Sequence, residues 1–348
     1  MVKSEGLRER WIALRAKEPN MRIRDAAESL GVREGHLVAT QRGETAELLR
    51  VESWGDLIKE LGTLGRAMGL TRNEQVVIEK HGRYVNVEAS EHMGMVLDEG
   101  IDLRLFFSRW AHAFSVRSES KKGPLRSIQI FDSSGNAIHK VYVFQDGEVE
   151  AFDSWVEERT SDESIKFAEP EHSDEVAERP DGEVDVAALR NSWANLGSTH
   201  DFYPMLAKHS VTRMQAMRLA GAEFAYRVDP QSYASLIETL AQDGLPFMAF
   251  VGNPGCIQIH SGIAKKIVKM DKWFNIFDPD FNLHVRSDQI EDCWVSRKPT
   301  HEHGDIWSLE AFSGDSQNVL SLFGLRKRDN PQSPEWMARF EKHVRTLS

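Results

Sequence analysis

One histidine, His200, lies where a side chain could act as a ligand. It falls within the stretch from Trp193 to His209, in which Ser198 or Thr199 can cap a following helix. In the first turn of such a helix, the imidazole projects outward while the apolar side chains that follow pack inward: Phe202, Met205 and Leu206. Pro204 fits here, because proline is tolerated early in a helix. The residues alone leave two alternatives open, a structural histidine or a ligand.

A second arrangement with metal-ligand chemistry is the run His301-Glu302-His303. Two histidines two residues apart share a face only on a strand, and zinc needs further ligands. Pro299 and Gly304 instead mark this run as a loop, with no third ligand close in the sequence. Cys256 and Cys293 match no zinc or redox spacing. Because the chain also lacks G-x-S-x-G and Gly-rich phosphate motifs, common hydrolase, nucleotide and thiol chemistries have no support.

Charge and composition limit the class of protein. The 348 residues are 41% hydrophobic and 28% charged, which is ordinary for a globular protein, and no apolar stretch is long enough to span a membrane. The charged N-terminal sequence lacks the apolar core of a signal peptide, so we expect a cytoplasmic protein. Twelve acidic and three basic residues between Glu157 and Asp185 give this segment −9 of the net charge of −11. We expect a solvated acidic linker over residues 157–186.

The parts of the chain on either side of this linker repeat each other at an offset of about 180 residues. Residues 54–61 correspond to 233–240, and residues 73–82 to 253–262. The same offset joins further pairs along the chain: 7–11 with 189–193, 102–105 with 282–285, Phe131 with Phe312, and Trp155 with Trp336. Copies of this length are too long for a solenoid, so we expect two similar domains over residues 1–156 and 187–348.

Each copy begins with the apolar spacing of helices and continues with the alternation of strands. The expected helices cover residues 7–17, 24–31, 54–68, 187–195, 200–209, 213–221 and 231–243. The expected strands cover residues 76–80, 84–87, 103–116, 125–131, 138–144, 256–259, 267–277, 283–295, 307–312 and 319–323. Helices followed by strands favour an α+β fold, in which each half is a large antiparallel meander sheet flanked by helices.

Segment 22–32 is similar to the core of a helix-turn-helix, and its alternative is a helix hairpin that packs on its own sheet. The matching segment of the second copy, 212–221, lacks this likeness. The net charge of −11 also opposes binding to phosphates, so we expect no nucleic-acid partner. A regulatory or interaction protein that uses this segment is the less favoured alternative.

Several segments taken together resemble one known family. They are the surroundings of His200 followed by 210–216, and the segments 102–106, 294–300 and 323–326. None is specific alone, but their order and separations along essentially the whole chain are similar to the HemS/ChuS/PhuS family of bacterial cytoplasmic haem-degrading and haem-trafficking proteins. The duplication and the variable linker fit the same family.

The resemblance implies that His200 is the proximal ligand of the haem iron. Arg104 of the first half would lie on the distal side and take part in any catalysis, because it can donate to a bound water or dioxygen without competing as a ligand. The resemblance leaves open whether His209 or His284, the repeat counterpart of Arg104, serves as an alternative ligand. The first half has no histidine at the position of His200, so one haem per chain, between unequal halves, fits better than two.

The resemblance also implies the rest of the pocket. Arg213 and Lys298 would meet the haem propionates, Phe250 would line the apolar part, and Arg326 would add a polar contact. These residue types suit a group that needs an imidazole on iron, an apolar slot for the ring and cations for two carboxylates. The family often has polar or aromatic residues where this chain has 320–322, Leu-Ser-Leu, so contacts from that strand are in doubt.

The implied function is to take up imported haem and to degrade it or deliver it onward. Degradation would be an oxygenase-type ring opening that uses an external electron donor. A carrier would instead hand haem to a downstream haem oxygenase, and a haem-uptake transporter or a reductase would be further partners. A pure haem chaperone without turnover is the main alternative. All of these share the same binding residues, so the sequence does not separate them.

Overall fold

The structure, a computed structural model, describes residues 4–120, 123–143, 146–169, 178–302 and 304–325, together with 338, 339 and 342. The chain divides into two compact units. Unit 1 comprises Met1–Arg72, Glu79–Ser173 and Asn253–Gln258. Unit 2 comprises Asn73–Ile78, Asp174–Gly252 and Ile259–Ser348. Each unit therefore includes a short segment from the other half of the sequence.

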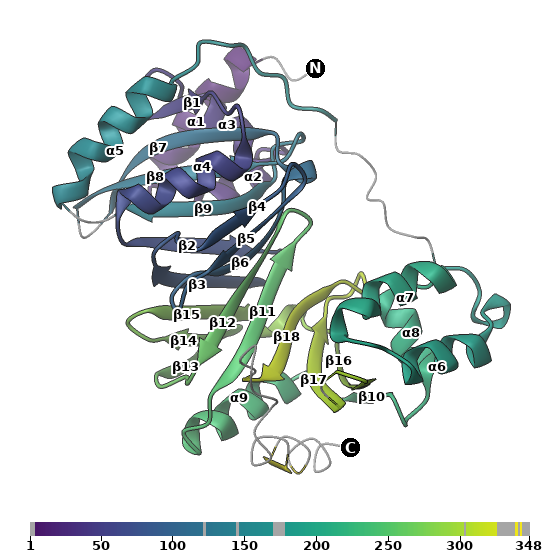
Figure 1. The fold of residues 1–348 in the computed structure, drawn as a ribbon. Coiled ribbons are helices and arrows are strands. Elements are labelled where there is room, and N and C mark those ends of the chain that lie inside the picture. Colours follow the sequence, from purple (N-terminus) through teal and green to yellow (C-terminus); the bar gives the residue numbers. More distant parts are fainter. Residues whose placement is uncertain are drawn as a thin grey trace. The chain divides into compact units, whose positions relative to one another are not determined.

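Unit 1 combines helices with antiparallel strands (Figure 1). Its helices are α1 (Ser4–Lys17), α2 (Ile23–Ser29), α3 (Glu34–Ala39), α4 (Trp54–Leu61) and α5 (Asp146–Arg159), with 3-10 turns η1 (Gly62–Leu64) and η2 (Phe107–Arg109). One run of neighbouring strands is β1 (Ala46–Leu49), β7 (His112–Ser120), β8 (Gly123–Phe131), β9 (Ala137–Val143) and β2 (Ala67–Arg72). A second run is β6 (Asp102–Phe106), β5 (Met93–Leu97) and β4 (Val87–Ala89).

Unit 2 repeats this order of elements (Figure 1). Its helices are α6 (Val186–Ala194), α7 (Phe202–His209), α8 (Arg213–Ala220) and α9 (Ser232–Gln242), with 3-10 turns η3 (Asp181–Glu183), η4 (Thr199–Asp201) and η5 (Ser287–Gln289). One run of neighbouring strands is β10 (Ala225–Val228), β16 (Asp292–Thr300), β17 (Gly304–Phe312), β18 (Asn318–Gly324) and β11 (Phe247–Asn253). The second run is β15 (Phe281–Arg286), β14 (Trp273–Phe277) and β13 (Ile267–Met270). The division between the units falls within β3 (Val76–Gly82) and β12 (Cys256–Gly262).

The repetition extends to irregular details of the strands. The register between β8 and β9 shifts at Phe131, and the register between β17 and β18 shifts at Phe312. After each shift, the amide of the next residue, Asp132 or Ser313, donates to the carbonyl four residues on, at 3.0 Å. The expected duplication is therefore confirmed, together with the α+β class and the antiparallel sheets flanked by helices.

Three expected strands are wrong in length, because each is two strands. A 3-10 turn divides 103–116 into β6 and β7, and another divides 283–295 into β15 and β16. Segment 267–277 contains β13 and β14 on either side of a turn in which Asp271 has a φ of 48°. Apolar residues continue through these breaks, so the alternation pattern gives no sign of the turns.

Two further boundaries differ from the prediction. The helix expected over 54–68 ends as α4 at Leu61, and after η1 the chain turns at Gly65, with a φ of 78°, into β2. The strand expected over 84–87 is also wrong, because residues 83–86 lie outside any strand and β4 begins only at its last residue. A positive φ of 51° at Asn86 interrupts the extended backbone there.

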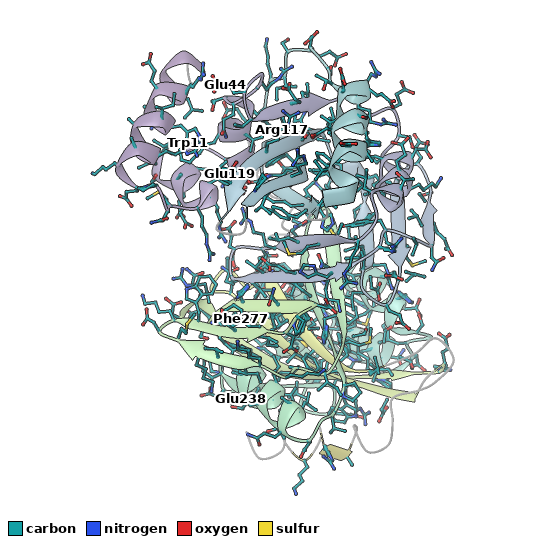
Figure 2. All side chains as sticks on the ribbon, turned by 90° about the vertical axis from the view of Figure 1, so that its left-hand side faces the viewer. Trp11, Glu44, Arg117, Glu119, Glu238 and Phe277 are labelled. Carbon is teal, nitrogen blue, oxygen red and sulfur yellow. The ribbon has the colours of Figure 1, made fainter. Side chains whose placement is uncertain are left out.

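Helices α1, α2 and α3 form their own small core in unit 1. Trp11 of α1 (Figure 2) is 5% exposed and packs with Leu7, Ala26, Ala27 and Leu37. The helix-turn-helix-like segment therefore buries apolar residues against its own unit. None of the helices in the described part of the chain combines the length and apolarity that crossing a membrane requires.

Asn253 ties a segment from the second half of the sequence into unit 1. Its Nδ2 donates to the carbonyls of Arg72 at 2.9 Å and Ile138 at 2.8 Å. Its Oδ1 accepts from the amides of Gly255 and Cys256, both at 3.0 Å. One side chain thus satisfies four backbone groups, which otherwise would lose their partners on folding.

Asn73, the repeat counterpart of Asn253, does the same in unit 2. Its Nδ2 donates to the carbonyls of Gly252 at 3.1 Å and Val319 at 2.9 Å. Its Oδ1 accepts from the amides of Gln75 at 3.0 Å and Val76 at 2.8 Å. The two copies therefore use one hydrogen-bonding device to hold a segment from the other half of the sequence.

We predict that Asn253→Ala lowers the free energy of unfolding by about 2 kcal/mol, because backbone groups near the core lose hydrogen bonds. Urea unfolding followed by circular dichroism measures the change. The control is Asn191→Ala, at an exposed position of α6, and should shift the midpoint little. Equal effects of the two variants would contradict the role given to Asn253.

Candidate functional site

His200 lies in η4, the turn that leads directly into α7. The Ser198 hydroxyl accepts from the His200 amide at 3.2 Å, and the Asp201 carboxylate accepts from the Ser198 amide at 2.7 Å. This capping box fixes the backbone, while the His200 side chain is exposed. No residue in the described ranges forms a side-chain hydrogen bond or ion pair with the imidazole. The capping hydrogen bonds fix the backbone at His200, while its two ring nitrogens have no hydrogen-bond partner among the described residues.

The two alternative histidines already have protein partners. His209, at the end of α7, shares a hydrogen bond with the Ser192 hydroxyl at 2.8 Å, and burial lowers its pKa. His284, on β15, shares a hydrogen bond with the Asn275 side chain at 2.8 Å. Its ring centroid also lies 5.2 Å from that of Phe277. Either histidine would have to give up a hydrogen bond on one ring nitrogen to ligate through it.

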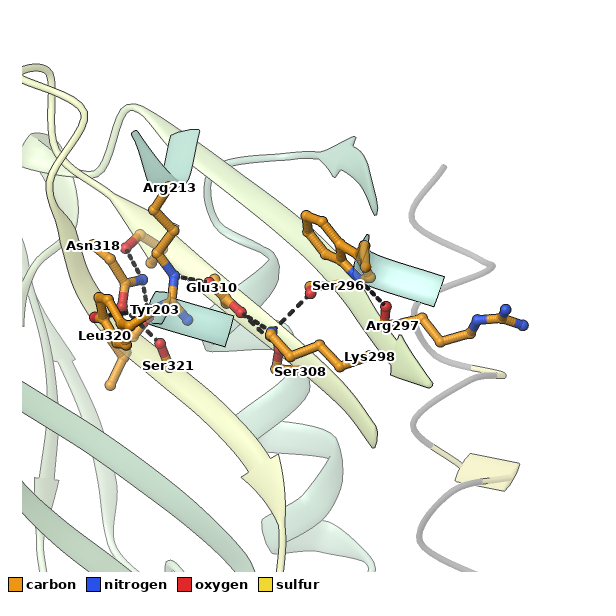
Figure 3. A network of polar contacts seen from close by, with 12 residues as sticks. Tyr203, Arg213, Ser296, Arg297, Lys298, Ser308, Glu310, Asn318, Leu320 and Ser321 are labelled. Atoms are coloured by element: carbon orange, nitrogen blue, oxygen red, sulfur yellow. Dashed lines mark hydrogen bonds and ion pairs between the residues drawn. The ribbon is translucent and has the colours of Figure 1, made fainter. Parts of the chain in front are cut away.

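Arg213 at the start of α8 and Lys298 on β16 converge on the carboxylate of Glu310 on β17 (Figure 3). Arg213 Nε donates to Glu310 Oε2 at 2.6 Å, and Lys298 Nζ donates to Oε1 at 2.8 Å. Lys298 also donates to the hydroxyls of Ser296 at 2.8 Å and Ser308 at 3.3 Å. The Glu310 side chain is fully buried, and those of Lys298 and Arg213 are 3% and 15% exposed. We call these three charged residues the Glu310 network.

All three members of the Glu310 network are charged. Burial opposes ionisation of Glu310, but the charges of Arg213 and Lys298 outweigh it and hold the pKa of Glu310 well below its usual range. Burial likewise opposes the charge of Arg213, yet Glu310 raises the pKa of Arg213. Two cations and one anion leave the network with one net positive charge away from bulk water.

Aromatic rings join this network to the turn that holds His200. Phe202, two residues after His200, has its ring centroid 4.6 Å from Lys298 Nζ and 5.2 Å from the Arg213 guanidinium carbon. The Phe323 ring lies 5.9 Å from the same ammonium and 5.0 Å from the ring of Phe250, which is half-buried on β11. Unit 2 therefore brings cations and aromatic rings together beside α7.

Arg104 lies in unit 1, on β6. It forms an ion pair with Asp102 and donates to the carbonyl of Leu103 at 3.1 Å. Burial raises the pKa of Asp102, although Arg104 opposes this. The other described candidates lie in unit 2: His200, Arg213, Phe250 and Lys298. Arg326 lies outside the described residues.

The described residues form neither a zinc site nor a reactive thiol. His301 is exposed in the turn between β16 and β17, and His303 is not among the described residues. No group of three or more His, Cys, Asp or Glu side chains in the described part of the chain could hold a metal ion. Burial raises the pKa of the Cys256 and Cys293 thiols to about 12, so neither provides a thiolate near neutral pH.

Glu310 and Tyr203 escape prediction from sequence. The available signal for Glu310 is a lone acidic residue within the apolar end of an expected strand. Its partners are 97 and 12 residues away, so the pairing becomes visible only in the fold. Tyr203 is 62% exposed, and its hydroxyl accepts from Arg213 at 3.1 Å.

Unit 1 contains a buried ion network of the same composition, in which the helix supplies the acid and the strands supply both bases. Glu34 on α3 pairs with Lys140 on β9 and, at 2.7 Å, with Arg72 on β2. Burial opposes ionisation of Glu34, but the two cations lower its pKa to about 2. Glu34 and Arg213 are the first residues of equivalent helices, α3 and α8. The same helix position therefore holds an acid in unit 1 and a base in unit 2.

Comparison with known proteins gives one consistent result. The model of the haemin-degrading HemS/ChuX domain matches residues 31–158 and 210–343. The hemin transport protein HmuS of Yersinia pestis is 33% identical over 340 residues, 97% of each chain. The structure of holo-PhuS, a heme-binding protein from Pseudomonas aeruginosa, matches over 99% of both chains with 41% identity and a TM-score of 0.93. The structure of ChuS, an E. coli heme oxygenase, matches over 98% of both chains with 31% identity and a TM-score of 0.85. The chain therefore belongs to the HemS/ChuS/PhuS family.

Proposed function

We propose that this protein binds haem in the cytoplasm as part of haem utilisation, with His200 as the axial ligand of the iron. The observation that carries the proposal is the state of His200, whose backbone is fixed by a capping box and whose exposed ring has no polar side-chain partner among the described residues. His209 and His284 are already hydrogen-bonded, and both thiols are buried and protonated. Relatives named for hemin transport, heme binding and heme oxygenation support haem as the bound group.

The surroundings of α7 suit the other parts of a haem molecule. The half-buried ring of Phe250, together with Phe323, offers an apolar surface for the porphyrin. The net positive charge of the Glu310 network favours the propionates, with Arg213 and Lys298 as the groups that receive them. The further polar contact from Arg326 remains part of the proposal.

For Arg104 we propose the distal role that the family resemblance implies. The ion pair with Asp102 and the bond to a backbone carbonyl restrict the guanidinium, while a third of the side chain is exposed. A restrained cation that cannot ligate iron suits a donor to an oxygen-containing group.

Haem would supply the redox chemistry of any ring opening, and the chain would supply ligation, orientation and hydrogen bonding. Electrons would come from an external donor, since both cysteines are buried, protonated thiols. Degradation is favoured by the likeness to ChuS, a heme oxygenase, and carriage by the likeness to HmuS, a hemin transport protein. A haem-uptake transporter would be the upstream partner.

We predict that His200→Ala weakens haemin binding and changes the Soret band in a spectroscopic titration. Substituting a residue that hydrogen-bonds to a metal ligand lowers metal affinity by about 10–100-fold. Removing the ligand itself should therefore lower haemin affinity by at least as much. The matched control is His301→Ala, because His301 is also an exposed turn histidine. An unchanged Soret band in His200→Ala would show that another residue ligates the iron, and His209→Ala would then be the next variant to test.

We predict that Arg104→Ala leaves haemin affinity nearly unchanged but slows ring opening by about 10²-fold, the usual effect of removing one donor from a reacting oxygen. Single-turnover absorbance measurements report the rate, and Arg50→Ala, an exposed arginine of unit 1, is the control. A loss of affinity equal to that of His200→Ala would show that Arg104 holds haem rather than acting on it.

We predict that the haem-loaded protein loses its Soret band in air when ascorbate or a reductase is added, with release of iron. The absorbance and a colorimetric iron assay follow the reaction. An intact Soret band and no free iron would overturn degradation and leave the chaperone function.

A further inference from the structure

The Glu310 network contains more cations than anions, yet every N–H group of its lysine already has an acceptor. The three N–H groups of Lys298 have acceptors in Ser296, Ser308 and Glu310 (Figure 3). Arg213 donates from Nε to Glu310 and from Nη1 to Tyr203. A carboxylate of a ligand can therefore reach Lys298 only where a present acceptor gives way.

Glu310 is the charged acceptor with which such a ligand would compete for the two cations. Its two oxygens hold both cations, and Ser308 adds a hydrogen bond at 2.8 Å. Ligand and Glu310 would be two carboxylates beside the same pair of cations. Because the side chain of Glu310 is fully buried, water screens their repulsion poorly.

We propose that Glu310 is an internal counter-anion that competes with the carboxylates of an anionic ligand for Arg213 and Lys298, and so sets the affinity and charge preference of this site. The identity of the ligand as haem rests on the function proposed above. The competition itself follows from the network and applies to any ligand that places a carboxylate or phosphate there. For a protein that must hand its ligand on, such a competitor keeps binding reversible.

Unit 1 provides a matched control. Glu34 is an equally buried carboxylate with one arginine and one lysine partner, and its pKa is also lowered. No role in ligand binding is assigned to it. Glu34→Gln and Glu310→Gln therefore remove the same charge from the same kind of network, one in each unit.

The first experiment titrates both variants with haemin and with haemin dimethyl ester, in which the two carboxylates are neutral. We expect Glu310→Gln to bind haemin about tenfold more tightly than the original protein, since close charge pairs couple this strongly or more. Its affinity for the ester should not change, and Glu34→Gln should leave both affinities unchanged. Equal tightening for the ester, or no tightening for haemin, would overturn the proposal.

A second variant keeps the test decisive if Glu310→Gln leaves two buried cations unbalanced and fails to fold. Lys298→Met makes the network neutral and should weaken haemin binding. Adding Glu310→Gln to it removes the competitor and restores one net positive charge, on Arg213. We expect haemin affinity to recover in the double variant. A double variant as weak as Lys298→Met alone would show that Lys298 binds the ligand and that Glu310 does not compete.

A test with inorganic phosphate distinguishes failure of the proposed competition from failure of the proposed haem binding. At constant ionic strength, phosphate should raise the melting temperature of the double variant more than that of the original protein or of Glu34→Gln. If the original protein gives no Soret band but phosphate acts in this way, haem binding fails and competition by Glu310 stands. If the Soret band forms and neither affinity recovery nor the phosphate effect is seen, the haem function stands and the competition fails.

Discussion

A buried carboxylate between two cations is the constraint on which each unit depends. The charge of Glu34 or Glu310 would be costly away from water, and it is stable only because an arginine and a lysine from separate elements reach it. In unit 2 those elements are α8 and β16, so the network joins the third helix to the strands. Phe202 packs against both cations, so the turn that presents His200 is built on the same network.

The exchange of charge between the units turns a repeated scaffold into an asymmetric one. At the start of the third helix, Glu34 presents an acid where Arg213 presents a base. At this position an anionic ligand would face a carboxylate in unit 1 and a guanidinium in unit 2, although each network carries one net positive charge. Meanwhile the asparagine device and the strand shifts are kept in both copies. The fold tolerates opposite charges at equivalent positions because either arrangement satisfies the buried carboxylate, and function can therefore differ between units that share one fold.

The sequence predicted what depends on local pattern. The offset of about 180 residues revealed the duplication, and the capping residues around Ser198 placed His200 at a helix start with its ring outward. Strand boundaries were predicted less well, since η2 and η5 interrupt runs whose apolar character continues. The Glu310 network was not predicted, because its members come from segments that only the fold brings together. The family resemblance named Arg213 and Lys298 but gave no sign that a carboxylate already holds them.

That carboxylate changes how a cation near a ligand should be interpreted. An arginine and a lysine beside an aromatic surface suggest two free charges for two propionates, but with Glu310 present they amount to one. A site with two unopposed buried cations would be hard to fold without ligand, since each desolvated charge costs several kcal/mol unless paired. Glu310 removes that cost in the ligand-free chain and leaves a single positive charge for recognition. The same residue thus makes the empty unit stable and limits how tightly the filled one can hold its ligand.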